Sequence, residues 1–222
     1  MCYSVESSLK TTTLSFLAIV YLLSSKIPHF QWLGITLIGW CGMQFDELLL
    51  WLTDPRKGCT KMNEIITMTL IPFTLLGQPL FSLWGSLYVF PWATLSQFKK
   101  KCMLFYTVFC SVIMYFVHFY KPDKTCTTVT KKGHLNWVTR KFIRSNNILP
   151  VYLAALIILP LLFLWNKNLL LIFCLLIFPI IGFKLGQYSD AQGSIWCYYT
   201  SYSSIIASLA LFLKQMNIYN IL

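Results

Sequence analysis

Charged residues are scarce in this chain of 222 residues, and acidic residues are the scarcest of them. Asp, Glu, Lys and Arg make up 11% of the sequence, whereas soluble domains carry roughly a quarter of charged residues. Apolar residues make up 57%, and the mean hydropathy is +0.64. Because a soluble fold of this size could not bury so much apolar surface, the composition predicts an integral membrane protein.

Patterns typical of metal sites and of cleaved signal peptides are also missing. The eight cysteines include no C-x-x-C pair and no Cys/His spacing of a zinc site, so we expect neither a metal nor any other cofactor. Cys41, Cys110 and Cys174 lie inside apolar runs, where cysteine behaves as a small hydrophobic residue. The first apolar run has only Lys10 before it and no small-residue cleavage site after it, which favours a first spanning helix over a signal peptide.

The net charge is +11, from 18 basic and 7 acidic residues. In a soluble protein this excess would suggest nucleic-acid binding. Here most Lys and Arg residues lie between the apolar runs, where they meet anionic headgroups and set the orientation of the chain. The expected partner is therefore the lipid bilayer and not nucleic acid.

Seven segments approach the roughly 20 apolar residues that cross a bilayer. They are 8–25, 32–52, 62–90, 102–120, 148–165, 168–185 and 195–213. None alternates like a strand, so the predicted fold is an all-α, polytopic bundle of about seven transmembrane helices in a single domain, 1–222. Pro72 and Pro79 are the predicted bending points of the long third segment.

The basic connection 121–147 is the only sizeable one. Its second half predicts a short helix in the headgroup plane, because apolar and basic side chains fall on different helical faces. The apolar face holds Leu135, Val138 and Phe142, and the basic face holds Arg140 and Arg144.

Two signals disagree about orientation. With seven crossings, the side of the N-terminus holds 12 Lys and Arg against 6 on the other side, so the positive-inside rule predicts a cytosolic N-terminus. Cys59 and Cys126 lie on the N-terminal side and could form a disulfide, but only if that side faces an oxidising compartment. We favour the charge rule, and the disulfide with the opposite orientation stays the alternative.

Ionisable side chains inside a spanning segment are costly unless they are paired or hydrated, so each one is a candidate site. Asp46 and Glu47 are the clearest, roughly 9–11 Å in from the end of the second helix. Gln44 shares a helical face with Glu47, whereas Asp46 shares another face with Gly39 and Gly42. We therefore expect one acid to face a cavity and the other a tight helix contact.

Further polar residues are predicted near the same membrane face. Glu64, Thr67, Thr74 and Gln78 align as a stripe that could line a cavity. The complete set of candidate binding residues is Glu6, Gln44, Asp46, Glu47, Glu64, Thr67, Gln78, His118 and His134. Together they could bind a cation, relay protons or act as acid and base. The alternative is that Glu64 only caps its helix and His134 lies in a solvated loop.

Small side chains repeat at helical spacing in the first and last segments. They are Ser4, Ser8, Thr11 and Ser15, and Ser194, Cys197, Ser201, Ser204 and Ser208. We favour close helix packing over ligand contact for both faces.

Several short motifs resemble one known family. They are Met1-Cys2-Tyr3-Ser4-Val5-Glu6-Ser7-Ser8, the segment from Met43-Gln44 to Glu47, Gln78-Pro79, Gly133-His134-Leu135-Asn136-Trp137 and Gly193-Ser194-Ile195-Trp196-Cys197. Over nearly the whole chain the sequence resembles uncharacterised small seven-helix membrane proteins of large DNA viruses of protists and of some bacteria. The resemblance implies a seven-helix fold and brings no established activity.

Two other seven-helix families fit poorly. A retinal protein needs a lysine in the middle of its last helix, and here Lys214 lies at the end. Ceramidase-like hydrolases use a zinc site with two histidines four residues apart, and this sequence has no such pair.

Three functions fit the sequence: a structural or partner-binding membrane protein, which we favour, a small channel or transporter for ions, protons or solutes, and a membrane-embedded hydrolase of lipid-like substrates. A continuous polar path would favour transport. A blind pocket with Glu47, a histidine and a hydroxyl would favour an enzyme. An enclosed Glu47 would favour the structural role, and polar helix faces could also seal a homo-oligomer.

Overall fold

The computed structural model describes residues 4–119, 126–137, 169–186 and 191–216. Most of these residues are helical, which confirms the predicted all-α class. The elements are α1 (Val5–Leu23), α2 (Pro28–Leu52), α3 (Lys61–Ile65), the π-helical turn η1 (Ile66–Leu70), α4 (Ile71–Val89), the 3-10 turn η2 (Trp92–Thr94), α5 (Gln97–Phe119), β1 (Thr128–Val129), β2 (Leu135–Asn136), α8 (Leu169–Gly186) and α9 (Gln192–Gln215).

Helices begin where the sequence satisfies their first backbone N–H groups. The Ser4 hydroxyl accepts a hydrogen bond from the Ser7 N–H at 3.2 Å and so caps α1. The Thr60 hydroxyl accepts from the Asn63 N–H at 3.2 Å and caps α3 in the same way. Pro28 occupies the first position of α2, where a missing N–H costs nothing.

The π turn η1 lies directly before Pro72, one of the two predicted bending points. Proline cannot donate a backbone hydrogen bond, and its ring clashes with the carbonyl four residues earlier. A wider turn at this point accommodates both effects. The run Lys61–Val89 therefore continues as one 29-residue rod with an irregular turn near its first third.

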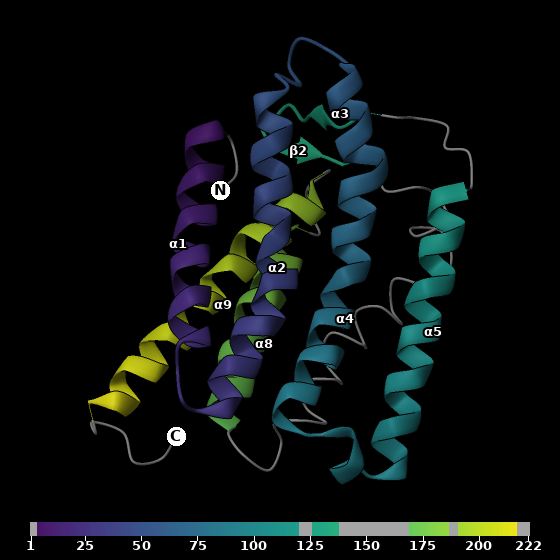
Figure 1. Ribbon diagram of the computed structural model, residues 1–222. Helices are drawn as coiled ribbons and strands as arrows, with labels where there is room; N and C mark the ends of the chain where they lie inside the picture. The colour runs from purple at the N-terminus through teal and green to yellow at the C-terminus, as the bar shows by residue number, and fades with distance from the viewer. Residues whose placement is uncertain (1–3, 120–125, 138–168, 187–190, 217–222) are drawn as a thin grey trace.

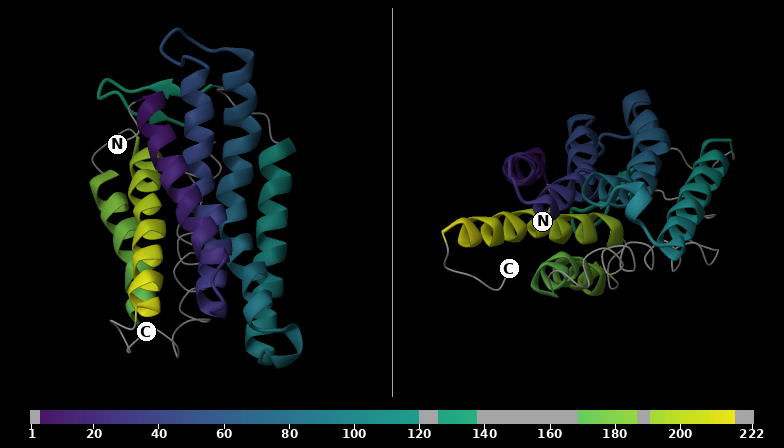
Figure 2. Two further views of the ribbon diagram at one scale, coloured as in Figure 1. Left: turned by 60° about the vertical axis from the view of Figure 1, so that its left-hand side comes forward. Right: turned by 60° about the horizontal axis from the view of Figure 1, so that its bottom comes forward.

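The long helices run side by side, and the hairpin, residues 126–137 with strands β1 and β2, lies across one end of them (Figure 1). At this hairpin end α1 begins, α2 ends and α9 begins (Figures 1 and 2). α4 ends and α5 begins at the opposite end. Because α2 contacts α1, α4 and α9, it is the central helix of this arrangement.

Glycines bring α2 close to α4. A Cβ atom on Gly39 would lie 3.1 Å from the Gln78 Cα and 3.0 Å from the Phe81 ring. A Cβ atom on Gly42 would lie 3.2 Å from the Thr74 methyl group. Such contacts between small residues are typical of helix packing in membranes, where close approach maximises van der Waals contact.

Six of the seven predicted spans coincide with these helices, and the segment 148–165 lies outside the described residues. By length and apolar composition, however, only α2 and the run Lys61–Val89 could cross a membrane among the described helices. Serines, threonines and tyrosines lower the hydropathy of α1 and α9. A core helix of a soluble protein meets the same criterion, so these two helices alone do not establish a bundle of seven crossings.

One prediction within the connection 121–147 is wrong. Leu135 was expected on the lipid-facing side of an interfacial helix, but it lies in strand β2 and is fully buried. The hairpin closes through a turn at Gly133, whose φ of 82° suits glycine. Residues 138–147, the remainder of the expected interfacial helix, lie outside the described residues.

The glycine contact between α2 and α4 gives a matched test. We expect Gly39→Ala to lower the free energy of unfolding by about 1–3 kcal/mol relative to Gly77→Ala, because the new Cβ would press on the α4 backbone. At Gly77 a Cβ would meet only the Phe81 ring, at 3.9 Å. Unfolding of the purified variants in detergent measures the difference, and equal stabilities would contradict the tight contact.

Candidate functional site

The two acids of α2 lie on different faces, as the sequence predicted. The Thr11 hydroxyl on α1 donates to Gln44 Oε1 at 2.9 Å, so the Gln44 face points toward α1. Asp46 interacts with the Thr74 hydroxyl of α4, on the side of the glycine contact. Glu47 is fully buried. Both acids are therefore enclosed by the protein, and neither lies on the exposed face of α2.

Small side chains join α1, α2 and α9 in one polar contact. The Ser204 hydroxyl donates to Ser15 Oγ at 3.3 Å, and Cys41 hydrogen-bonds with both serines. One turn further on, the Ser208 hydroxyl donates to the Ala18 carbonyl at 3.2 Å. The small faces of α1 and α9 thus pack against each other, which confirms the packing interpretation of the serine repeats.

The register of these helices brings further polar groups to one level. α1 and α9 run in the same direction, with Ser15 beside Ser204, and α2 runs antiparallel to them, with Gln44 beside Thr11. Following that register toward the hairpin end places Ser8, Glu47 and Cys197 at the same depth. All three are fully buried.

The hairpin is fastened to α3 and η1 by a disulfide and a network of hydrogen bonds, which we call the clasp. Cys59 and Cys126 form the disulfide, with their Cα atoms 5.6 Å apart. Asn63 Nδ2 donates to the Thr127 carbonyl at 3.0 Å, and the Thr127 N–H donates to Asn63 Oδ1 at 2.9 Å. Thr67 bonds both partners: its hydroxyl lies 3.0 Å from Asn63 Oδ1 and 2.8 Å from the Thr127 hydroxyl.

The far side of the hairpin packs on α9. The Trp137 ring lies against Gly193, where a Cβ atom would come within 2.6 Å of it. His134 is 4% exposed, and burial, reinforced by the nearby Lys132 charge, lowers the pKa of its imidazole below the ordinary value. The clasp and the Trp137 contact together hold the hairpin over the end of the bundle from two sides.

The structure brings only part of the predicted site together. Gln44, Asp46, Glu47, Thr67, Gln78 and His134 are all buried toward the middle or the hairpin end of the bundle. Thr67 serves the clasp, and the Gln78 backbone lies against Gly39 within the α2–α4 contact. The side chain of His118, on α5, lies outside the described residues.

Two predicted acids lie apart from the buried cluster. Glu6 is exposed and pairs with Lys10 at 2.7 Å, and this contact lowers the pKa of the Glu6 carboxyl. Glu64 pairs with Lys61 at 3.1 Å in the first turn of α3. That position fits the alternative in which Glu64 caps its helix, and it does not fit a cavity shared with Glu47.

Sequence reasoning missed the clasp residues Asn63 and Thr127. Asn63 is fully buried and Thr127 nearly so. A local signal was present in the sequence. Asn63 lies four residues before Thr67 and three after the capping Thr60, so the Asn63 amide and the Thr67 hydroxyl share a helical face close to Cys59.

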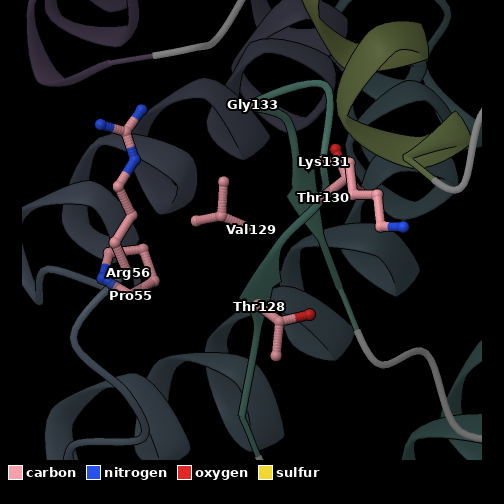
Figure 3. Close-up of a pocket in the computed structure, with 7 residues that line it drawn as sticks. All are labelled: Pro55, Arg56, Thr128, Val129, Thr130, Lys131 and Gly133. Atoms are coloured by element: carbon pink, nitrogen blue, oxygen red, sulfur yellow. The ribbon is translucent and has the colours of Figure 1, made fainter.

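A separate pocket of about 480 Å³ opens between the α2–α3 connection and the hairpin. Figure 3 shows the basic side chains of Arg56 and Lys131 on opposite sides of it, with Val129 between them. Glu47 does not line this pocket. At the hairpin end, Glu47 is therefore enclosed in the interior, whereas Arg56 and Lys131 border an open pocket on the outside.

No group of three or more His, Cys, Asp or Glu side chains within the described ranges could hold a metal ion. Comparison of the chain with models of known protein families, with curated proteins and with solved structures gives no match.

The clasp can be tested with two threonines of the same π turn. We expect Thr67→Ala to lower the free energy of unfolding by about 1–3 kcal/mol, because it removes the partner of the buried Thr127 hydroxyl and one of the two donors to Asn63 Oδ1. Thr69→Ala should change it by less than about 0.5 kcal/mol, since Thr69 is exposed and bonds only the Ile65 carbonyl of its own helix. Denaturant unfolding in detergent compares the two, and equal losses would argue against the clasp.

His134 makes the stability of the hairpin dependent on pH. Because its pKa is lowered in the folded chain from the ordinary 6.5, the unfolded chain binds more protons in that range. The stabilisation is present above pH 6.5 and is lost as the pH falls below it. We expect the wild type to lose more stability than His134→Gln between pH 8 and pH 5, measured by denaturant unfolding; parallel profiles would contradict the assignment.

Proposed function

We propose that this chain is a multi-pass integral membrane protein, with seven crossings, that binds a partner at its hairpin end and neither conducts nor catalyses. Support for the membrane location comes from the outer surface. Large apolar side chains that are at least half exposed occur along α1, α4, α5, α8 and α9; examples are Phe16, Trp84, Phe105, Ile180 and Phe212. Exposed apolar surface of this extent is typical of contact with lipid.

The interior shows the complementary pattern. Gln44, Glu47, Asn63 and Gln78 are fully buried between helices, as are several serines of α9. Uncharged polar and acidic side chains buried beside the apolar core, together with large apolar side chains on the outside, differ from the usual pattern of a soluble domain. In a bilayer this arrangement lets polar groups satisfy one another away from hydrocarbon.

The contact between α1, α2 and α9 is closed in the half that lies away from the hairpin. This observation favours binding over conduction. Beyond the level of Cys41, fully buried leucines fill the space between these helices: Leu22, Leu33, Leu37 and Leu211. A polar route along this contact would end there. The open pocket at the hairpin end, which Glu47 does not line, is where a partner can be reached.

The disulfide supports the orientation opposite to the one we favoured from charge. A bond between Cys59 and Cys126, 67 residues apart in sequence, persists in an oxidising compartment and is rare in the cytosol. The charge rule describes a statistical excess of Lys and Arg on the cytosolic side, whereas a disulfide requires an oxidising compartment. We therefore place the hairpin end and the N-terminus on the oxidising side of the membrane.

A membrane-embedded hydrolase is the second candidate. It is favoured by the buried hydroxyls of Ser8 and Ser194, which have no hydrogen-bond partner within the described residues and lie at the same end as Glu47 and His134. Turnover of a lipid ester that Glu47→Gln abolishes would establish this alternative. Ion flux through proteoliposomes that the same variant abolishes would instead establish conduction.

Membrane topology tests the proposal directly. Cysteines introduced at the exposed Lys57, in the α2–α3 connection, and at Lys99, near the start of α5, mark opposite ends of the bundle. In intact cells we expect a membrane-impermeant maleimide to label Lys57→Cys from the oxidising side and Lys99→Cys only after permeabilisation, relative to the unsubstituted chain.

Two outcomes would contradict this arrangement. Labelling of both positions from one side would exclude an odd number of crossings between them. The reverse pattern, with only Lys99→Cys accessible, would restore the cytosolic N-terminus of the charge rule.

A further inference from the structure

The open pocket at the hairpin end has a composition that suits one class of ligand. Its lining consists of Pro55, Arg56, Thr128, Val129, Thr130, Lys131 and Gly133. Two cations from separate segments, hydroxyl groups from β1 and the following turn, and an apolar valine between the cations make it basic and amphiphilic (Figure 3). Arg and Lys beside hydroxyl donors are the groups that recognise phosphate.

Two described acids near the pocket pair with lysines outside its lining. Asp54 pairs with Lys57 at 2.7 Å, and Glu64 pairs with Lys61 at 3.1 Å. Neither lysine lines the pocket. These two carboxylates therefore engage cations other than Arg56 and Lys131.

The pocket also lies where headgroups are expected. Arg56 follows the end of α2 by four residues, and its guanidinium carbon lies 5.4 Å from the centre of the Trp51 ring. The connection that follows an apolar helix is where basic side chains meet lipid headgroups. The contact with the Trp51 ring holds the Arg56 guanidinium close to the end of α2, where lipid phosphates are expected.

The clasp holds the two cations in a fixed relation. Cys59 follows Arg56 by three residues, and its disulfide joins the α2–α3 connection to the segment that continues into Lys131. Preorganised groups bind with less loss of conformational freedom than mobile ones. The same bond that closes the hairpin end therefore keeps both sides of the pocket in place.

We propose that this pocket binds the phosphate of a phospholipid headgroup in the leaflet that the hairpin end faces. The inference rests on the proposed membrane location and names the partner of the hairpin end. Val129 and Pro55 offer apolar contact beside the cations, which a headgroup with its glycerol backbone can use and a free phosphate cannot.

Two consecutive basic pairs supply matched controls. Arg56 and Lys131 line the pocket, whereas their neighbours Lys57 and Lys132 carry the same charge and do not. We expect Arg56→Gln and Lys131→Gln each to weaken binding of fluorescent phosphatidylglycerol to the full-length protein in neutral detergent micelles by about tenfold. Lys57→Gln and Lys132→Gln should each change it by less than about twofold.

The outcomes separate specific from unspecific binding. Equal weakening by all four substitutions would show that only diffuse positive charge attracts the lipid, and would overturn the proposal. Competition by inorganic phosphate at the same concentration as the lipid would show that the pocket takes a free anion, which would overturn the headgroup assignment. Persistence of the pattern with phosphate present would support it.

Failure of the proposed function is measured separately. Resistance of the wild type and of Arg56→Gln and Lys131→Gln to alkaline extraction from membranes reports insertion, which these exposed substitutions should not change. Insertion without selective lipid binding would overturn this inference alone. Release of the wild type by alkaline extraction would overturn the proposed membrane insertion, on which this inference rests.

Discussion

The close approach of three helices to α2 is the constraint on which the rest of the structure depends. Gly39 and Gly42 admit α4, and Cys41 meets serines of α1 and α9. The outward face of α2 that remains carries the exposed side chains of Ile38 and Phe45. Polar side chains of α2 are therefore enclosed between helices, where hydroxyl and amide groups of the neighbours can reach them.

The irregular start of the third helical segment follows from one residue and has effects at a distance. Because Pro72 cannot complete the regular ladder, the chain forms the π turn before it. Thr67 lies in that turn and bonds Asn63 on one side and Thr127 on the other. A local defect in a helix thus becomes the anchoring point of the hairpin, which covers the end of the bundle.

The sequence predicted the parts of the structure that depend on periodicity. The helix positions follow from the length of the apolar runs, and the two faces of α2 and the small packing faces of α1 and α9 follow from spacings of three and four residues. The predicted crossings put Cys59 and Cys126 at the same end of the bundle and so permitted a disulfide between them. The structure contains this bond. These features need no knowledge of distant neighbours.

The parts that failed depend on contacts between distant segments. Glu64 shares a helical face with Thr67, but it lies in the first turn of α3, where Lys61 can pair with it outside the bundle. Leu135 reads as part of an amphipathic helix, yet a glycine turn returns the chain to β1 and buries that side chain. Only the fold shows where a helix ends relative to its neighbours, and that position decides whether a polar residue meets solvent or the interior.

The charge rule and the disulfide predict opposite orientations. They are reconciled if the basic residues at the hairpin end bind a ligand instead of setting the orientation of the chain. The charge rule treats every Lys and Arg as a signal for the cytosolic side. Arg56 and Lys131 border a pocket that the clasp holds open, and Lys57 and Lys61 are engaged in ion pairs. Residues with such contacts have a structural role whichever side of the membrane they face. An excess of basic charge at this end is therefore compatible with the oxidising side proposed from the disulfide.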